Sequence, residues 1–75
     1  MITNKQIKVG KWFTLGNTII KIYEIVGDLI FVHIMSFDNG EYTEVCQWAL
    51  HRSWFKLAKV YTPYQEEKAD EEETI

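Results

Sequence analysis

The sequence is poor in cysteine, proline and glycine, with one, one and four of them in 75 residues. The single cysteine, Cys46, excludes a disulfide within the chain and a zinc site built from several thiolates. The four glycines lie singly, and no glycine-rich loop precedes a helix pattern. A disulfide-stapled scaffold and a P-loop nucleotide-binding protein are therefore excluded.

Long hydrophobic runs are also missing. No run without Asp, Glu, Lys or Arg is longer than nine residues, whereas a transmembrane helix needs about 20 apolar residues. The first residues, MITNKQIKVGK, lack the apolar segment of a signal peptide. We therefore expect a cytoplasmic protein that has no membrane partner.

Positive charge is scarce near the C-terminus. Residues 1–60 carry seven Lys/Arg against five acids, whereas residues 61–75 carry one lysine against six acids. Low hydrophobicity with concentrated like charge is typical of disordered segments. We expect one small domain over residues 1–64 and an acidic, disordered tail over 65–75, with a helix formed on a partner as the alternative for the tail.

The sequence does contain a regular series of turn signals. Gly16-Asn17, Gly27-Asp28 and Asn39-Gly40 each lie between segments rich in β-branched and aromatic residues. This pattern predicts antiparallel strands near residues 9–15, 18–26, 29–37 and 41–47. The next residues, WALHRSW (48–54), predict one helical or 3₁₀ turn, followed by a short last strand over 55–60. The predicted fold class is all-β, as a small five-stranded barrel or a strongly bent meander.

Four meandering strands, one helical turn and a fifth strand over residues 8–61 resemble the SH3-like small β-barrels, a superfold that includes Tudor-type modules. The resemblance rests on the order of elements. The acidic cluster and ALYDY-type segment of proline-binding SH3 domains are missing, as is the glycine pattern of KOW segments. The resemblance implies a fold and leaves the activity open, because such superfolds host unrelated functions.

The turn positions also predict which residues pair. A two-residue loop at Asn39-Gly40 pairs Phe37 with Tyr42, His33 with Cys46 and Phe31 with Trp48. One sheet face is then aliphatic, with Ile19, Tyr23, Ile25, Ile30, Val32, Ile34 and Val45. The other is aromatic, with Phe13, Ile20, Ile22, Phe31, His33, Met35, Phe37, Tyr42, Cys46 and Trp48 beside Lys11, Glu24 and Glu44. Because burying an unpaired charge is costly, we expect the aliphatic face to form the core.

Two alternatives change this assignment. A β-bulge near Glu24 would turn part of the second strand over and place Ile20 and Ile22 in the core. A closed barrel would instead use both faces of its strands. The aromatic face would then be covered by four later rings, those of Trp54, Phe55, Tyr61 and Tyr64.

The sequence offers little catalytic apparatus. In the predicted register Cys46 lies across from His33, but a nucleophile-base pair also needs an oxyanion hole and a cleft. The spacing of His33, Glu44, Cys46 and His51 matches no metal-binding motif. We expect no enzyme activity, no metal and no cofactor.

The aromatic face predicts a protein-interaction module that binds a partner protein or a second copy of itself. The predicted partner-binding residues are Glu24, Phe31, His33, Met35, Phe37, Tyr42, Glu44 and Trp48. A small accessory or inhibitory protein of phage or mobile-element type would fit this size and acidity.

The same rings also allow two other ligands. In single-stranded nucleic-acid binding they would stack on bases, with Arg52, Lys56 and Lys59 as basic contacts. An aromatic cage for a methylated lysine is the other use.

Overall fold

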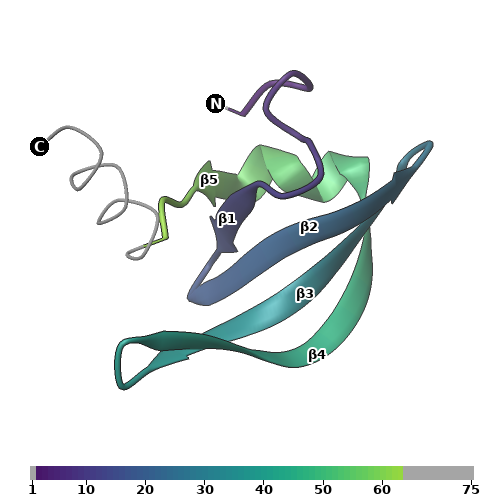
Figure 1. Cartoon of the computed structure of the whole chain (residues 1–75). Helices are drawn as coiled ribbons and strands as arrows, with labels where there is room; N and C mark the ends of the chain where they lie inside the picture. Colours follow the sequence, from purple (N-terminus) through teal and green to yellow (C-terminus); the bar gives the residue numbers. More distant parts are fainter. Residues whose placement is uncertain (1, 64–75) are drawn as a thin grey trace, which may run out of the picture.

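The structure, a computed structural model, describes residues 2–63. Its elements are β1 (Trp12–Leu15), β2 (Thr18–Val26), β3 (Leu29–Asp38), β4 (Glu41–His51), the 3₁₀ helix η1 (Arg52–Leu57) and β5 (Ala58–Val60). The strands form one antiparallel sheet in the order β4-β3-β2-β1-β5, compatible with a small barrel-like fold (Figure 1). The predicted all-β class, with a short helical turn before the last strand, is confirmed.

Two-residue turns join the first four strands, as the turn signals predict. Asn39 and Gly40 both have positive φ angles, 53° and 79°, which is what a type I′ hairpin turn requires. Near this turn the predicted pairing is confirmed, because Phe37 lies opposite Tyr42 and Met35 lies opposite Glu44.

The boundary between β4 and the helical turn differs from the prediction. Trp48 and the three residues after it belong to β4, which pairs with β3 as far as Leu29 opposite His51. The ten-residue β3 supplies ladder partners for this extra length, so the sheet satisfies backbone groups that a helical turn would otherwise pair. The helix therefore begins only at Arg52, and β5 is correspondingly short.

A β-bulge at Val45 interrupts β4. Glu44 lies opposite Met35, but the next β3 residue, Ile34, lies opposite Cys46 and leaves Val45 as the extra residue. A bulge turns the residues beyond it to the other face of the sheet. The predicted pairs His33–Cys46 and Phe31–Trp48 are therefore wrong. Trp48 lies opposite Val32, and Gln47 lies opposite His33.

A second bulge interrupts β2 at Tyr23. Glu24 lies opposite Phe31 and Ile22 lies opposite Val32, so Tyr23 is the extra residue. This is the alternative expected near Glu24. It turns Ile20 and Ile22 into the core, where both are buried.

The core lies on one face of the sheet and is closed by η1 and the N-terminal segment. Its buried residues are Ile7, Phe13, Ile20, Ile22, Ile30, Val32, Leu50, Phe55 and Ala58. The predicted division into faces is thus wrong for Phe13, Ile20 and Ile22, which are core residues. It is also wrong for Val45, whose exposed fraction is 63%.

Arg52 connects three segments at the start of η1. Its guanidinium donates to the carbonyl oxygen of Gly27 at 3.1 Å and to Oδ1 of Asn4 at 3.4 Å. Its Nε lies 3.8 Å from Oδ1 of Asp28. Its backbone N–H donates to the carbonyl oxygen of Asp28 at 2.7 Å. The side chain thus ties the β2–β3 turn and the N-terminal segment to the helix.

Replacing Arg52 with alanine is expected to lower the free energy of unfolding by about 1–2 kcal/mol, because a charge-assisted hydrogen bond is lost while the exposed ion pair adds little. Urea denaturation measures this change. Lys56→Ala, an exposed change in the same helix, is the control and should cost less than about 0.5 kcal/mol. Equal losses in the two variants would contradict the role given to Arg52.

Candidate functional site

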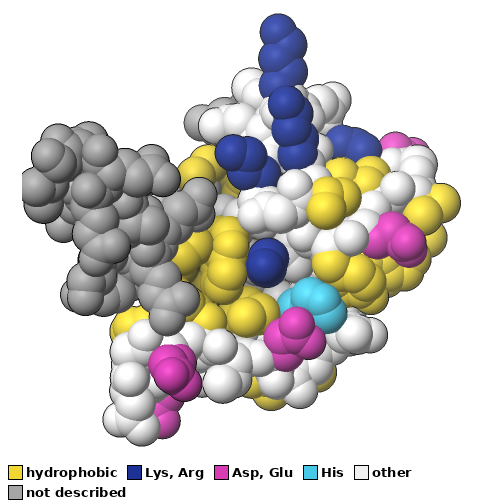
Figure 2. Space-filling model, viewed as in Figure 1, with side chains coloured by type: hydrophobic (Ala, Val, Ile, Leu, Met, Phe, Trp, Pro, Cys, Tyr) yellow, Lys and Arg dark blue, Asp and Glu magenta, His cyan; other side chains and the backbone are white. Residues whose placement is uncertain are grey.

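The sheet face opposite the core, which we call the outer face, is rich in aromatic side chains. Seven of the eight predicted partner-binding residues lie on it, namely Glu24, Phe31, His33, Met35, Phe37, Tyr42 and Glu44. The bulge at Val45 places Trp48, the eighth residue, on the core side of β4 instead. Over β2 to β4, Figure 2 shows hydrophobic side chains interrupted by single charged groups and a histidine.

One half of the outer face is a stack of rings on β2 and β3. Tyr23 stacks on His33 with 4.2 Å between ring centroids, and its ring lies 6.2 Å from that of Phe31. The His33 side chain is only 15% exposed, and its Nδ1 lies 3.4 Å from Oε2 of Glu44. That nitrogen has no hydrogen-bond partner among the described residues, because the contact with Glu44 lacks hydrogen-bond geometry. The predicted aliphatic face included Tyr23, which its bulge brings to the outer face.

The other half of the outer face is a cluster around Tyr42. The Trp12 and Phe37 rings lie 4.8 and 4.6 Å from the Tyr42 ring. The hydroxyls of Tyr42 and Tyr61 are 2.8 Å apart, and Nζ of Lys21 lies 5.5 Å from the centre of the Trp12 ring. Tyr61 therefore partly covers this half, as the closed-barrel alternative expects.

Two of the other rings in the closed-barrel alternative do not cover the outer face. Trp54 and Phe55 line a small hollow with the core residues Leu50 and Ala58, on the opposite side of the sheet. The predicted contribution of Tyr64 lies outside the described residues. Sequence reasoning did not select Trp12 for the site, because its contact with Tyr42 joins strands that are not neighbours in the sheet.

The edge of the sheet at β4 is a second candidate surface. Of the described strands, only β3 pairs with β4, so the other side of β4 is unpaired. Segment 45–50 has no charged side chain, and all of it except Leu50 is exposed. Charged side chains, prolines and bulges are among the features that keep natural edge strands from pairing with another chain. The bulge at Val45 interrupts the ladder, which leaves Cys46 to His51 as the regular stretch.

Two exposed tryptophans flank Leu50 beside this edge. Trp48, two residues before Leu50 on the same side of β4, is 57% exposed, and Trp54 on η1 is 51% exposed. Trp54 shares its hollow with Leu50 and Leu15. Tryptophans are enriched among the residues that contribute most to the binding energy of protein interfaces.

The groups considered for catalysis and metal binding do not come together. Cys46 is exposed and lies on the opposite side of the sheet from His33. His51 caps η1, since its Nδ1 accepts a hydrogen bond from the backbone N–H of Ser53 at 3.1 Å. In the part of the chain that the structure describes, no three His, Cys, Asp or Glu side chains are grouped closely enough to hold a metal ion.

The three predicted nucleic-acid contacts are also dispersed. Arg52 and Lys56 line a hollow beside Asp28, at the end of β3 that is remote from Phe37. Lys59 lies on β5 opposite Thr14. The outer-face tryptophan, Trp12, instead meets Lys21, which is not among the predicted nucleic-acid contacts.

Within residues 2–63 there is no helix long and apolar enough to cross a membrane. Comparison of the chain with protein-family models, with curated proteins and with solved structures gave no match.

Proposed function

We propose that the protein is a non-enzymatic interaction module that binds an extended segment of a partner protein along the unpaired edge of β4. The observation that carries this proposal is the unpaired edge from Cys46 to Ala49, which is exposed, has no charged side chain and includes Trp48. In strand addition the main-chain hydrogen bonds supply affinity, and pockets for alternate side chains supply specificity.

Side chains on the two sides of the added strand would meet different surfaces. On the core side an apolar residue packs on Trp48 and approaches Leu50. On the outer side the partner passes Gln47 and Ala49 and meets the margin of the outer face, where Glu44 and His33 lie on neighbouring strands. The outer face therefore contributes specificity, while Trp48 is the main anchor.

The order of elements further supports placing the protein in the SH3-like small-barrel superfold, with β1 between β2 and β5 and a 3₁₀ turn before β5. This placement leaves the partner open, because the superfold serves many functions. The predicted role as an accessory or inhibitory protein stays a proposal.

The proposal is tested by placing a lysine in the middle of the edge. Gln47→Lys changes an exposed outer-face side chain and puts a charge where an added strand would lie. We expect this variant to keep the wild-type circular dichroism spectrum. It should also bind at least tenfold more weakly to a partner that is captured from cells of the source organism, identified and purified.

Val60→Lys is the matched control. It places the same charge on β5, the opposite edge of the sheet, at another exposed position. It should leave the affinity within about twofold of wild type. Equal binding by Gln47→Lys and wild type would overturn strand addition at β4.

A second copy of the chain is the other candidate for this edge. β4 has Glu44 just before its regular stretch and Arg52 just after it. An antiparallel pair of β4 strands would therefore bring opposite charges together at both ends. Sedimentation velocity between about 10 μM and 1 mM, on wild type and Gln47→Lys, tests whether the protein forms this dimer. A monomer at every concentration would rule out self-association.

A further inference from the structure

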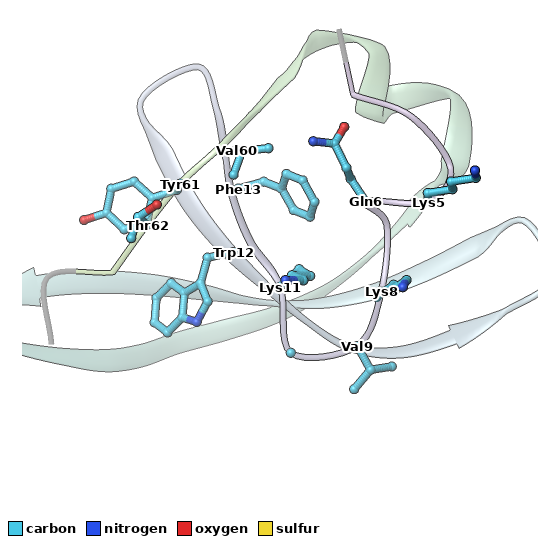
Figure 3. Close-up of a pocket in the computed structure, with 11 residues that line it drawn as sticks. Lys5, Gln6, Lys8, Val9, Lys11, Trp12, Phe13, Val60, Tyr61 and Thr62 are labelled. Atoms are coloured by element: carbon cyan, nitrogen blue, oxygen red, sulfur yellow. The ribbon is translucent and has the colours of Figure 1, made fainter. Parts of the chain in front are cut away.

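A pocket of about 530 Å³ opens between the N-terminal segment and the paired strands β1 and β5 (Figure 3). Three lysines, Lys5, Lys8 and Lys11, and the rings of Trp12 and Tyr61 contribute to its lining. Its position on the β1–β5 side of the sheet separates it from the β4 edge. The proposed function does not use this pocket.

The lysine-bearing segment is held in place by the sheet. The backbone N–H of Gly10 donates to the carbonyl oxygen of Ile22 at 2.8 Å, and the N–H of Ile22 donates to the carbonyl oxygen of Lys11 at 3.0 Å. A further bond, from the N–H of Lys11 to the carbonyl oxygen of Lys8 at 3.1 Å, closes the turn between these two lysines. Two of the three positive charges are therefore carried on a fixed backbone.

These lysines have no acidic partner among the described residues. The ion pairs found in residues 2–63 involve His33, His51 and Arg52. Three ammonium groups within seven residues repel one another, so an anionic ligand at the pocket would be stabilised by all three. The pocket thus has the charge of a site for a multiply charged anion.

The chain itself carries such an anion close in sequence to the pocket. Thr62 lines the pocket, and the twelve residues of segment 64–75 include six acids and one lysine. Because an extended residue spans at most about 3.6 Å, the four residues from Thr62 to Glu66 can bridge at most roughly 14 Å. A tether of this length gives an effective concentration on the order of millimolar. We propose that the acidic segment 64–75 binds the lysine pocket of its own chain.

The ring arrangement favours this peptide over a nucleic acid. Base stacking needs an open ring face, but Nζ of Lys21 lies over the Trp12 ring at 5.5 Å and the Tyr42 ring packs against it at 4.8 Å. The cations are lysines, whose ammonium groups act as mobile point charges and suit carboxylates arriving in several geometries. The pocket is therefore a carboxylate-binding site with an aromatic wall.

The test compares the full chain with a full-length variant whose tail carries no acids, Glu66→Gln/Glu67→Gln/Asp70→Asn/Glu71→Gln/Glu72→Gln/Glu73→Gln. In ¹H–¹⁵N NMR spectra we expect shifts of the Trp12 indole N–H and of the backbone amides of residues 5–11. A synthetic peptide of residues 64–75 should bind the variant at least tenfold more tightly than the intact chain, whose pocket is already occupied. About 1 M salt should reproduce the shifts in wild type, because it screens charges beyond roughly 3 Å.

The reciprocal change is Lys5→Gln/Lys8→Gln/Lys11→Gln. It should shift the tail amides and abolish peptide binding, while the control Lys56→Gln/Lys59→Gln should do neither. The proposal is overturned if tail neutralisation leaves the pocket signals unchanged, or if they move only when a single-stranded oligonucleotide is added. Shifts that depend on protein concentration would assign the pocket to another copy's tail and would also overturn it. These outcomes do not depend on whether a partner binds along β4, which the Gln47→Lys variant tests separately.

Discussion

Replacing Phe13 with alanine is expected to remove most of the stability of the protein. The side chain is 1% exposed, and its ring meets that of Phe55 edge to face with 5.4 Å between centroids. Truncating a buried phenylalanine costs about 3–5 kcal/mol, because transfer energy is lost and a cavity remains. A domain of this size has a total stability on the order of 5 kcal/mol. Most of the free energy of unfolding therefore depends on the packing of Phe13 against Phe55.

Urea denaturation followed by circular dichroism measures the effect of Phe13→Ala. Phe37→Ala is the matched control, because the Phe37 ring is 43% exposed on the β3–β4 hairpin and its loss should cost about 1 kcal/mol. Similar unfolding midpoints for the two variants would mean that the core is not centred on Phe13.

Replacing Trp48 with alanine is expected to weaken partner binding about 30-fold or more while leaving the protein folded. A tryptophan at the centre of an interface typically contributes about 2 kcal/mol or more, which corresponds to that factor at 1.4 kcal/mol per tenfold. The indole is more than half exposed in the monomer, so its removal creates no cavity.

Isothermal titration calorimetry with the purified partner measures the loss, and thermal unfolding checks the fold. Trp54→Ala removes an indole of similar exposure from η1 rather than from the strand edge and should weaken binding less than about fivefold. If both variants bind as wild type does, Trp48 is not an anchor. If Trp54→Ala causes the larger loss, the partner lies on η1 and strand addition is wrong.

The sequence predicted the fold where local chemistry decides it. The turn at Asn39-Gly40 follows from residues that tolerate positive φ, and the pairs next to it, such as Phe37–Tyr42, are as predicted. The pairing fails only beyond Tyr23 and Val45. Both bulge residues are ordinary strand formers, so their residue types do not mark them. The bulge near Glu24 was expected only as an alternative, and the bulge at Val45 was not expected. The bulge at Tyr23 is stabilised because it places Ile20 and Ile22 in the core, and this packing depends on the tertiary structure.

The candidate surfaces were likewise predicted correctly close to a turn and incorrectly beyond a bulge or across distant strands. Residues on β3 that lie close to the turn, such as Met35 and Phe37, share the outer face as predicted. Trp48 lies beyond the bulge and changes sides. Trp12 and Tyr61 join the outer face only because the bent sheet brings β1 and the end of β5 to Tyr42, and no local pattern reports a contact of that range. The lysine pocket depends likewise on where the N-terminal segment packs.

The bulge at Val45 also affects how a one-residue insertion or deletion in β4 should be interpreted. Val45 has no partner of its own on β3, so a chain without it still has Glu44 opposite Met35 and Cys46 opposite Ile34. A one-residue gap at this point in an alignment therefore leaves Trp48 on the same side of the sheet. Homologous chains that differ there by one residue would keep the same edge, and should be aligned by their tryptophan rather than by their distance from the turn.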